Sequence, residues 1–188
     1  MLSVNESNIV RIDKNTPALP YKAEAIASLA REIWREHYTA LIGAAQVEYM
    51  LDLFQSAERI QTDILTDCYV YFIAERADCA NGHETVGYCA VRPKEDYLLL
   101  SKLYVRKEYR GKGIARRFLD EAAKPCLREF RIDKIRLTVN KYNTGSIAAY
   151  KKMGFRTIDL VVTDIGDGYV MDDYIMELRA FDPMAPTA

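Results

Sequence analysis

The chain has 188 residues, 49% of them hydrophobic, and its 26 basic and 27 acidic residues leave a formal net charge of −1. This size favours a single domain over residues 1–188, in which we expect 179–188 to form a flexible tail. The near-neutral charge argues against a dedicated nucleic-acid binder, and no apolar run approaches the roughly 18 residues that would predict a membrane span.

The cysteines Cys68, Cys79, Cys89 and Cys126 are scattered along the chain. They form no CxxC pair and have no clustered histidine beside them, so they predict reduced thiols rather than a metal site or a disulfide framework. Residues 1–17 also lack the basic start and apolar run of a secretory signal. We therefore expect a cytoplasmic protein without a bound metal.

The first third of the chain predicts one strand followed by three helices. Residues 8–13 alternate sufficiently to form a strand. Apolar residues at helical spacing predict an amphipathic helix over 22–38, and a second helix over 44–55 follows Gly43. A short third helix is expected through 57–66.

After the third helix the pattern changes to strands rich in β-branched and aromatic residues. We expect them, in order, at 68–76, 85–93, 96–105, 134–141 and on either side of the turn Gly166-Asp167-Gly168. The first two strands flank Asn81-Gly82, a strong hairpin signal. With the strand at 8–13, this predicts an α/β (α+β) fold whose sheet has about seven strands.

Residues 105–118, VRKEYRGKGIARRF, place six basic side chains and two glycines between a strand and a helix that begins near Ile114. The first N–H groups of a helix lack partners within the helix, and the macrodipole adds about half a positive charge there. At Gly111 and Gly113 no Cβ would keep an anion from those groups, and the basic side chains would add charge-assisted hydrogen bonds. The segment therefore predicts a phosphate-binding site. Its glycine spacing matches neither the P-loop motif nor the dinucleotide-binding fingerprint. The alternative is a merely basic, well-capped helix.

The helix that begins near Ile114 contains Pro125. A proline inside a helix removes one backbone hydrogen bond and clashes with the preceding turn, so we expect the helix to kink or restart there. Pro125 lies more than two turns from the glycines, so the phosphate site should be unaffected.

A second helix is predicted after the strand at 134–141. Asn143 is a good N-cap, and Gly154 is placed for a left-handed C-terminal stop. Asn143, Ser146 and Tyr150 share one helix face that extends about 10.5 Å at ~1.5 Å per residue. Such a face suits an extended ligand arm; the alternative is that Tyr150 is a core aromatic residue with a satisfied hydroxyl.

These two segments resemble the cofactor motifs of the GNAT superfamily of acyl-CoA N-acyltransferases. The run from Arg110 to Ala115, RGKGIA, matches the R/Q-x-x-G-x-G/A signature, and LTVNKYNTGSIAAYKKMGFRTI is similar to the second motif, which ends in Tyr-x-x-x-Gly-Phe. The resemblance extends over residues 8–178. It implies the GNAT fold, with a central mixed, mostly antiparallel sheet flanked by helices and splayed between the strands at 96–105 and 134–141.

The resemblance further implies that acetyl-CoA is the cofactor and that an amine attacks its thioester directly. The implied cofactor-binding residues are Leu103, Tyr104, Val105, Arg110, Gly111, Lys112, Gly113, Ile114, Ala115, Asn140, Asn143 and Ser146. Tyr150 would be the catalytic acid, because a phenol with a pKa near 10 can hydrogen-bond or protonate a departing thiolate of pKa roughly 8.5.

The group that deprotonates the amine is left unassigned by the sequence. Neutralising an alkylamine of pKa about 10 at pH 7.5 requires on the order of 3–4 kcal/mol, so a base or a water relay is useful. Many members of the family place a glutamate in the strand before the cofactor loop, but here residues 101–104 read SKLY. Glu48, Asp96, Asp172 and Asp173 are the candidate substitutes. The missing acid also motivates the alternative of a non-catalytic acyl-CoA-binding regulatory module.

The acceptor is predicted from an acidic, aromatic C-terminal region. Residues 159–177 carry six acids and no Lys or Arg, and DIGDGYVMDDYIMEL and the earlier IWREHY resemble elements of bacterial polyamine and diamine acetyltransferases. An acidic cleft lined by aromatic rings suits a polycation. The expected substrate-binding residues are Trp34, Tyr38, Asp172 and Asp173, with Tyr169 and Tyr174 as further aromatic candidates.

Several alternatives stay open for this region. Trp34 can be a core residue of its helix. Asp172 and Asp173 can lie in an exposed turn, and His37 can be a surface residue. The acceptor can then be a small amine, a protein or peptide amine, or an amino sugar. Many members of the family are dimers, so a homodimer is left open as well.

Overall fold

The computed structural model describes residues 7–78 and 82–179. Asn81 of the expected hairpin turn, Cys79 and nearly all of the tail expected at 179–188 lie outside these ranges. Within them, no helix is both long enough and apolar enough to cross a membrane.

Three helices follow the first strand, β1 (Asn8–Ile12): α1 (Leu19–Ile42), α2 (Ala44–Gln55) and α3 (Ala57–Leu65). The helix predicted over 22–38 is longer at both ends, because Pro20 lies in its first turn and Gly43 ends it. Gly43 has a φ of 83° and donates its N–H to the Thr39 carbonyl, so it stops α1 where α2 begins.

Within the described residues, seven strands form one sheet in the order β1-β2-β3-β4-β5-β7-β6. The remaining strands are β2 (Val70–Asp78), β3 (Gly82–Pro93), β4 (Leu98–Val105), β5 (Lys134–Asn140), β6 (Arg156–Gly166) and β7 (Tyr169–Arg179). Every neighbouring pair is antiparallel except β4 and β5, which run parallel. The expected mixed, mostly antiparallel sheet is confirmed.

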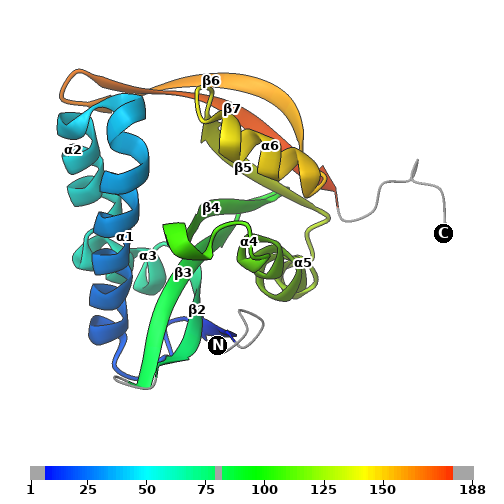
Figure 1. The fold of residues 1–188 in the computed structure, drawn as a ribbon. Helices are drawn as coiled ribbons and strands as arrows, with labels where there is room; N and C mark the ends of the chain where they lie inside the picture. Colours follow the sequence, from blue (N-terminus) through cyan, green and yellow to red (C-terminus); the bar gives the residue numbers. More distant parts are fainter. Residues whose placement is uncertain (1–6, 79–81, 180–188) are drawn as a thin grey trace.

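The sheet opens between β4 and β5. These strands pair only through Leu98–Leu99 and Ile135–Arg136, at the start of each strand, and Figure 1 shows them diverging beyond that point. The later residues of both strands therefore have no partner across the gap, although their backbone groups still need hydrogen bonds. The expected splay is confirmed, and it leaves a place where an extended ligand can bind.

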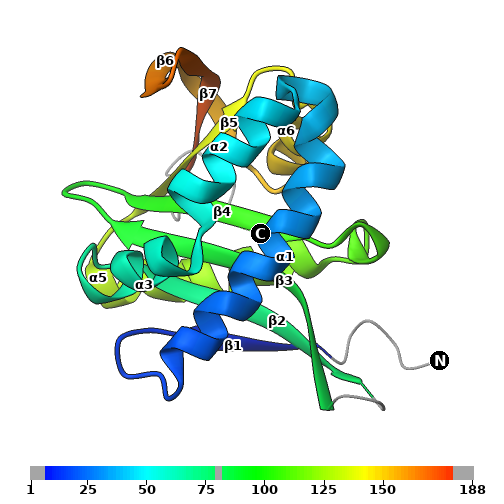
Figure 2. The same ribbon diagram turned by 90° about the vertical axis from the view of Figure 1, so that its left-hand side faces the viewer.

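Helices cover both faces of the sheet (Figures 1 and 2). Helices α1–α3 pack on one face. The other face carries α6 (Thr144–Lys152) and a helical segment made of α4 (Ile114–Arg117), a π-helical stretch (Phe118–Ala123) and α5 (Lys124–Phe130). Strand alternation separates two cores: Tyr71 and Ile73 point toward α1–α3, whereas Val70 and Phe72 point toward α4 and α5.

The irregularity predicted at Pro125 takes the form of the π-helical stretch. Pro125 is the second residue of α5, and the six residues that precede this helix, Phe118–Ala123, have the wider π pattern. This wider turn accommodates a residue that has no N–H to donate. Ile114 and the glycines before it lie at the opposite end of the segment, so the irregularity before Pro125 does not extend to the glycine turn.

Candidate active site

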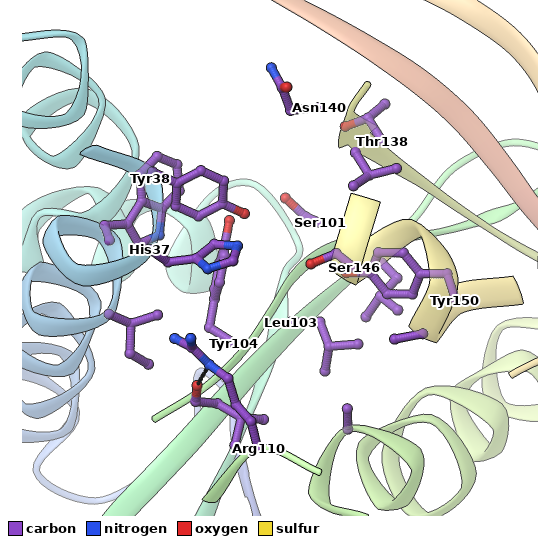
Figure 3. A pocket seen from close by; sticks show the side chains of 18 of the residues that line it. His37, Tyr38, Ser101, Leu103, Tyr104, Arg110, Thr138, Asn140, Ser146 and Tyr150 are labelled. Carbon is purple, nitrogen blue, oxygen red and sulfur yellow. Dashed lines mark hydrogen bonds between the residues drawn. The ribbon is translucent and has the colours of Figure 1, made fainter. Parts of the chain in front are cut away.

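A cavity of about 560 Å³ lies at the opening between β4 and β5. Its walls come from α1, α2, β4, the loop after β4, β5, α6 and β7, so it joins both faces of the sheet. Figure 3 shows Arg110 at one end, Thr138 and Asn140 at the other, and the side chains of α1 and α6 facing each other between them.

The glycine turn forms one end of this cavity. Gly111 and Gly113 have φ angles of 73° and 85°, and a Cβ built on either would meet no atom within 4 Å. The turn therefore needs glycine for its backbone angles and leaves open space over the first amides of α4. Most of the predicted residues here line the cavity, namely Arg110, Gly111, Gly113, Ile114 and Ala115. Lys112 does not; its Nζ lies 5.3 Å from the centre of the Tyr109 ring.

Arg110 is held at the mouth of the cavity by two contacts. Its Nε donates to the Val105 carbonyl at 2.9 Å, and a terminal nitrogen donates to the Glu36 carboxylate at 2.6 Å. Lys107 lies 3.5 Å from the same carboxylate. Glu36 therefore already holds the cation that would meet an incoming phosphate.

Replacing Glu36 with glutamine is expected to raise the affinity for coenzyme A about two- to fivefold at low salt, because a partly exposed ion pair contributes up to about 1 kcal/mol. Isothermal titration calorimetry measures this. Glu32→Gln is the matched control, since Glu32 pairs with Arg106 one turn earlier on α1. Weaker binding by Glu36→Gln would mean that Glu36 orients Arg110 instead of competing for it.

A β-bulge in β4 shapes the floor of the cavity. Val91 pairs with Leu100 and Ala90 pairs with Lys102, so Ser101 is an extra residue without a partner on β3. Ser101 lines the cavity, as do the predicted residues Leu103, Tyr104 and Val105.

The bulge also explains why Lys102 is not in the cavity. Lys102 is only 6% exposed and faces α3, where its Nζ donates to the Asp63 carboxylate at 2.7 Å. The Tyr71 hydroxyl donates to the same carboxylate oxygen at 2.6 Å, and Arg59 also pairs with Asp63. Burial lowers the pKa of Lys102, and the Asp63 charge opposes that effect. This network belongs to the core between the sheet and α3.

Helix α6 and the end of β5 form the opposite wall. Of the residues predicted there, Asn140, Ser146 and Tyr150 line the cavity. Asn143 is only 3% exposed and caps α6, because its Oδ1 accepts from the Ser146 N–H at 3.2 Å. Although it does not line the cavity, its side chain lies close to His37 and Tyr38 of α1.

Tyr150 reaches the cavity from the sheet face that carries α4 and α6. Its ring packs edge-on against Phe155 with centroids 5.8 Å apart. Burial raises the pKa of Tyr150, and the nearby Tyr38 adds to that effect. The phenol therefore keeps its proton at neutral pH and can donate a hydrogen bond into the cavity.

Aromatic side chains of α1 form the wall across from Tyr150 (Figure 3). The Trp34 ring lies 4.7 Å from the Tyr38 ring and 5.6 Å from the Tyr104 ring. Trp34 is 4% exposed, so it belongs to the core and to the cavity wall at once. His37, considered above as a surface residue, also lines the cavity, and burial together with the Arg110 charge lowers its pKa.

The two adjacent aspartates of β7 have different positions. Asp172 pairs with Lys141 and, among the described residues, is not part of the cavity wall. Asp173 lines the cavity and is only 4% exposed, because consecutive strand residues point to opposite faces. Burial raises the pKa of Asp173 to about 6; a hydrogen bond from Thr138 opposes that rise, and Asp172 adds to it.

The other candidate residues lie outside the cavity wall. Glu48 pairs with Arg35 and Asp96 with Lys134, both on the surface. The Tyr169 ring packs 5.3 Å from that of Tyr49, and Tyr174 packs against the core that faces α4. Of the four acids considered as a base, Asp173 alone lines the cavity within the described ranges. Those ranges contain no cluster of His, Cys, Asp or Glu side chains that could hold a metal ion.

Sequence reasoning missed the contribution of α2. Ile42 at the end of α1, Gln46 and Met50 of α2, and Val170 and Met171 of β7 line the end of the cavity beyond Tyr38. The hairpin of β6 and β7 is held there because Gln46 Nε2 donates to the Val170 carbonyl at 3.0 Å and the Tyr49 hydroxyl donates to the Ile165 carbonyl at 2.6 Å. No local pattern in α2 indicates this contact between distant segments.

Comparisons with known proteins show the family and the fold. The family model described as "Acetyltransferase (GNAT) family" matches residues 26–155, whereas no curated protein matches the chain. PaiA N-acetyltransferase from Thermoplasma acidophilum, solved with coenzyme A, is 22% identical with a TM-score of 0.71, over 92% of this chain and 99% of that one.

Two further solved structures are similar in fold. Arabidopsis thaliana NAA60, in complex with a bisubstrate analogue, is 18% identical with a TM-score of 0.61, over 92% of this chain and 99% of that one. A GNAT family acetyltransferase from Elizabethkingia anophelis with acetyl-CoA bound is 15% identical with a TM-score of 0.56, over 93% of this chain and 99% of that one. Since the family model spans well over half of the chain, from within α1 to Phe155, the chain belongs to the acetyltransferase (GNAT) family.

Proposed function

We propose that this protein transfers an acetyl group from acetyl-CoA to a primary amine by direct attack of the amine on the thioester. The observation that carries the proposal is the cavity itself. It begins at an open glycine turn beside Arg110, passes through the opening between β4 and β5, and ends at the buried carboxylate of Asp173.

The residues at the glycine turn fit the diphosphate of coenzyme A. A Cβ at Gly111 or Gly113 would meet no atom within 4 Å, and Arg110 and Arg116 line the same end of the cavity. Beyond the turn, the unpaired edge of β4 around Leu103 and Val105 can hydrogen-bond an extended pantetheine arm, with Ser146 on the opposite wall. The solved neighbours that hold coenzyme A or acetyl-CoA support this assignment.

When bound, acetyl-CoA supplies an already activated thioester, so the chain needs no nucleophile of its own. Tyr150 would donate its phenolic proton to the departing sulfur, because burial keeps it protonated. The backbone N–H groups of β4 beside the bulge at Ser101 would polarise the acetyl carbonyl.

The far end of the cavity favours an amine with an apolar or aromatic substituent. Ile42, Met50 and Met171 line it together with the rings of Trp34 and Tyr38. An ammonium group can approach the aromatic rings, which attract cations, while its apolar substituent is removed from water.

A polyamine is the second candidate, favoured by the acidic hairpin of β6 and β7. However, Asp173 is the one acid of the cavity wall among the described residues, and two other hairpin acids are engaged locally: Asp172 with Lys141, and Asp164 with the Gly166 N–H. A polyamine would have to place its further charges outside the cavity. A peptide amine is a third candidate, supported by the similarity to NAA60.

The cellular location is part of the same proposal. We place the reaction in the cytoplasm, where thiols such as Cys89 and Cys126 stay reduced.

An amine panel with acetyl-CoA tests the proposal, with released thiol measured spectrophotometrically. We expect turnover, with kcat/KM for 2-phenylethylamine about tenfold above that for spermidine. The apolar wall should favour the aromatic ring of 2-phenylethylamine over the charged chain of spermidine. Amino acids and a short peptide complete the panel. A preference for spermidine would favour the polyamine, whereas tight coenzyme A binding without thiol release from any amine would favour a non-catalytic acyl-CoA-binding module.

A further inference from the structure

We infer that Asp173 receives the acceptor amine as its ammonium ion and removes the proton before attack. The inference rests on the proposed function and concerns the step that the sequence leaves unassigned, since β4 carries no acid toward the cavity. It assigns a catalytic base to a strand, β7, on the far side of the opening from β4.

The placement of Asp173 follows from the pairing of β5 and β7. Asp173 is the cross-strand partner of Asn140, and Thr138 is the diagonal neighbour on the same sheet face. All three residues line the cavity. They lie on the face that carries α1 and α2, because the alternate residues Val139 and Tyr174 pack into the core that faces α4 and α6.

Asp173 and Tyr150 therefore approach the cavity from opposite faces of the sheet. Tyr150 enters from α6, and Asp173 enters from the side of α1 and α2. In a direct acyl transfer the amine adds to one face of the carbonyl, and its nitrogen and the departing sulfur are then separate substituents of a tetrahedral carbon that a base and an acid must reach from different directions. The two side chains thus have the arrangement needed for a base at the amine and an acid at the sulfur.

Asp173 differs from other buried acids of the described residues in its lack of a cationic partner. Asp63 is 2% exposed and meets Lys102 and Arg59, and Glu177 is 8% exposed and meets Arg136. Asp173 is 4% exposed and forms no ion pair within the described residues. A buried carboxylate without a cation is costly, so an arriving ammonium ion would supply the missing partner.

The groups around Asp173 come from each element packed against it. The side chain of Thr138 on β5 lowers the pKa of Asp173, Tyr38 of α1 lies within electrostatic range, and Val161 is the cross-strand partner on β6. Asp172, the neighbour on β7, repels it but is itself paired with Lys141. Burial dominates and raises the pKa of Asp173 to about 6, which leaves the carboxylate ionised yet basic at neutral pH.

The proposed step balances as follows. The carboxylate of Asp173 takes one proton from the ammonium ion, and the neutral nitrogen then forms a bond to the acetyl carbon. The carbon–sulfur bond breaks, and the sulfur takes the phenolic proton of Tyr150. The nitrogen loses its second proton as the amide forms; this proton restores the phenol through water, and Asp173 releases its own to solvent. The sum is an amide, a free thiol and one proton.

The pH dependence of kcat/KM tests the inference, using the best amine of the panel. In the wild type we expect a rise through about pH 6, where Asp173 ionises, and a fall near pH 10, where the free ammonium deprotonates. Asp173→Asn should lower kcat/KM about 100-fold at pH 7.5 and abolish the rise near pH 6, with activity instead increasing toward pH 10. Asp172→Asn is the matched control: it should keep the rise and most of the activity, with the rise moved slightly to lower pH because the repulsion by Asp172 is removed.

A second measurement on the protein without ligands shows whether the variant is folded and whether Asp173 titrates in place. Its pKa is raised above the unfolded value of about 3.9, so the stability linked to its protonation is present below pH 4 and is lost as the pH rises through about 6. Asp173→Asn should therefore melt several degrees higher than the wild type at pH 8, with the difference vanishing near pH 4.

The outcomes separate this inference from the proposed function. Turnover by the wild type together with a folded Asp173→Asn that keeps both its activity and the rise near pH 6 would overturn the inference and leave the acetyltransferase standing. Absence of thiol release from every amine would overturn the proposed function and the inference with it. A loss of activity at all pH values without a change in profile shape would show a merely structural role and would also overturn the inference.

Discussion

Gly113→Glu is expected to weaken coenzyme A binding by about 1000-fold, equivalent to about 4 kcal/mol. Gly113 has a φ of 85°, and its Cβ position opens onto the space over the first amides of α4. A glutamate there would strain the backbone and bring a negative charge to the place proposed for the diphosphate. Isothermal titration calorimetry with coenzyme A measures the loss directly.

Gly168→Glu is the matched control for this substitution. Gly168 has a similar φ of 76° and equally open surroundings, but it lies at the turn between β6 and β7. The control should suffer the same backbone strain and keep its affinity for coenzyme A. Equal losses in both variants would mean that strain alone explains the result, and unchanged binding by Gly113→Glu would exclude the glycine turn as the diphosphate site.

Tyr150→Phe is expected to lower kcat about 100- to 1000-fold, because the departing sulfur would lose its proton donor. The KM for acetyl-CoA should change little, since the ring remains in place against Phe155. Steady-state kinetics with the best amine of the panel separates the two parameters.

Tyr142→Phe is the corresponding control, because Tyr142 is 63% exposed just before α6. It should behave as the wild type. If Tyr150→Phe kept the wild-type kcat, the phenol would be a packing residue and another group would have to donate the proton; a change confined to the KM would assign Tyr150 to binding.

Sequence reasoning predicted the backbone features around the cavity that depend on residues close together in the chain. The glycine turn needs two positive φ angles over three residues, and the helix after it starts where the basic run indicates. The cap by Asn143 depends on a hydrogen bond to a residue only three positions later. The opening between β4 and β5 was an expectation of family resemblance, and the register of the strands confirms it.

The parts that remained unresolved depend on contacts between distant segments. Asp172 and Asp173 are equivalent in the sequence, and only the register of β5 with β7 assigns Asp173 to the cavity and Asp172 to Lys141. Likewise, the bulge at Ser101 turns Lys102 toward Asp63 of α3, and no residue type at that position predicts a bulge. The wall formed by Met50 exists because the β6–β7 hairpin packs on α2.

The most direct test is a crystal structure of the protein with a conjugate that joins coenzyme A through an acetyl bridge to the nitrogen of 2-phenylethylamine. We predict that the diphosphate contacts the backbone amides of residues 111–115, that the bridge passes between β4 and β5, and that the amine nitrogen lies within hydrogen-bond distance of Asp173. A diphosphate bound elsewhere, or a nitrogen directed away from β7 with Asp173 facing only protein atoms, would contradict the account.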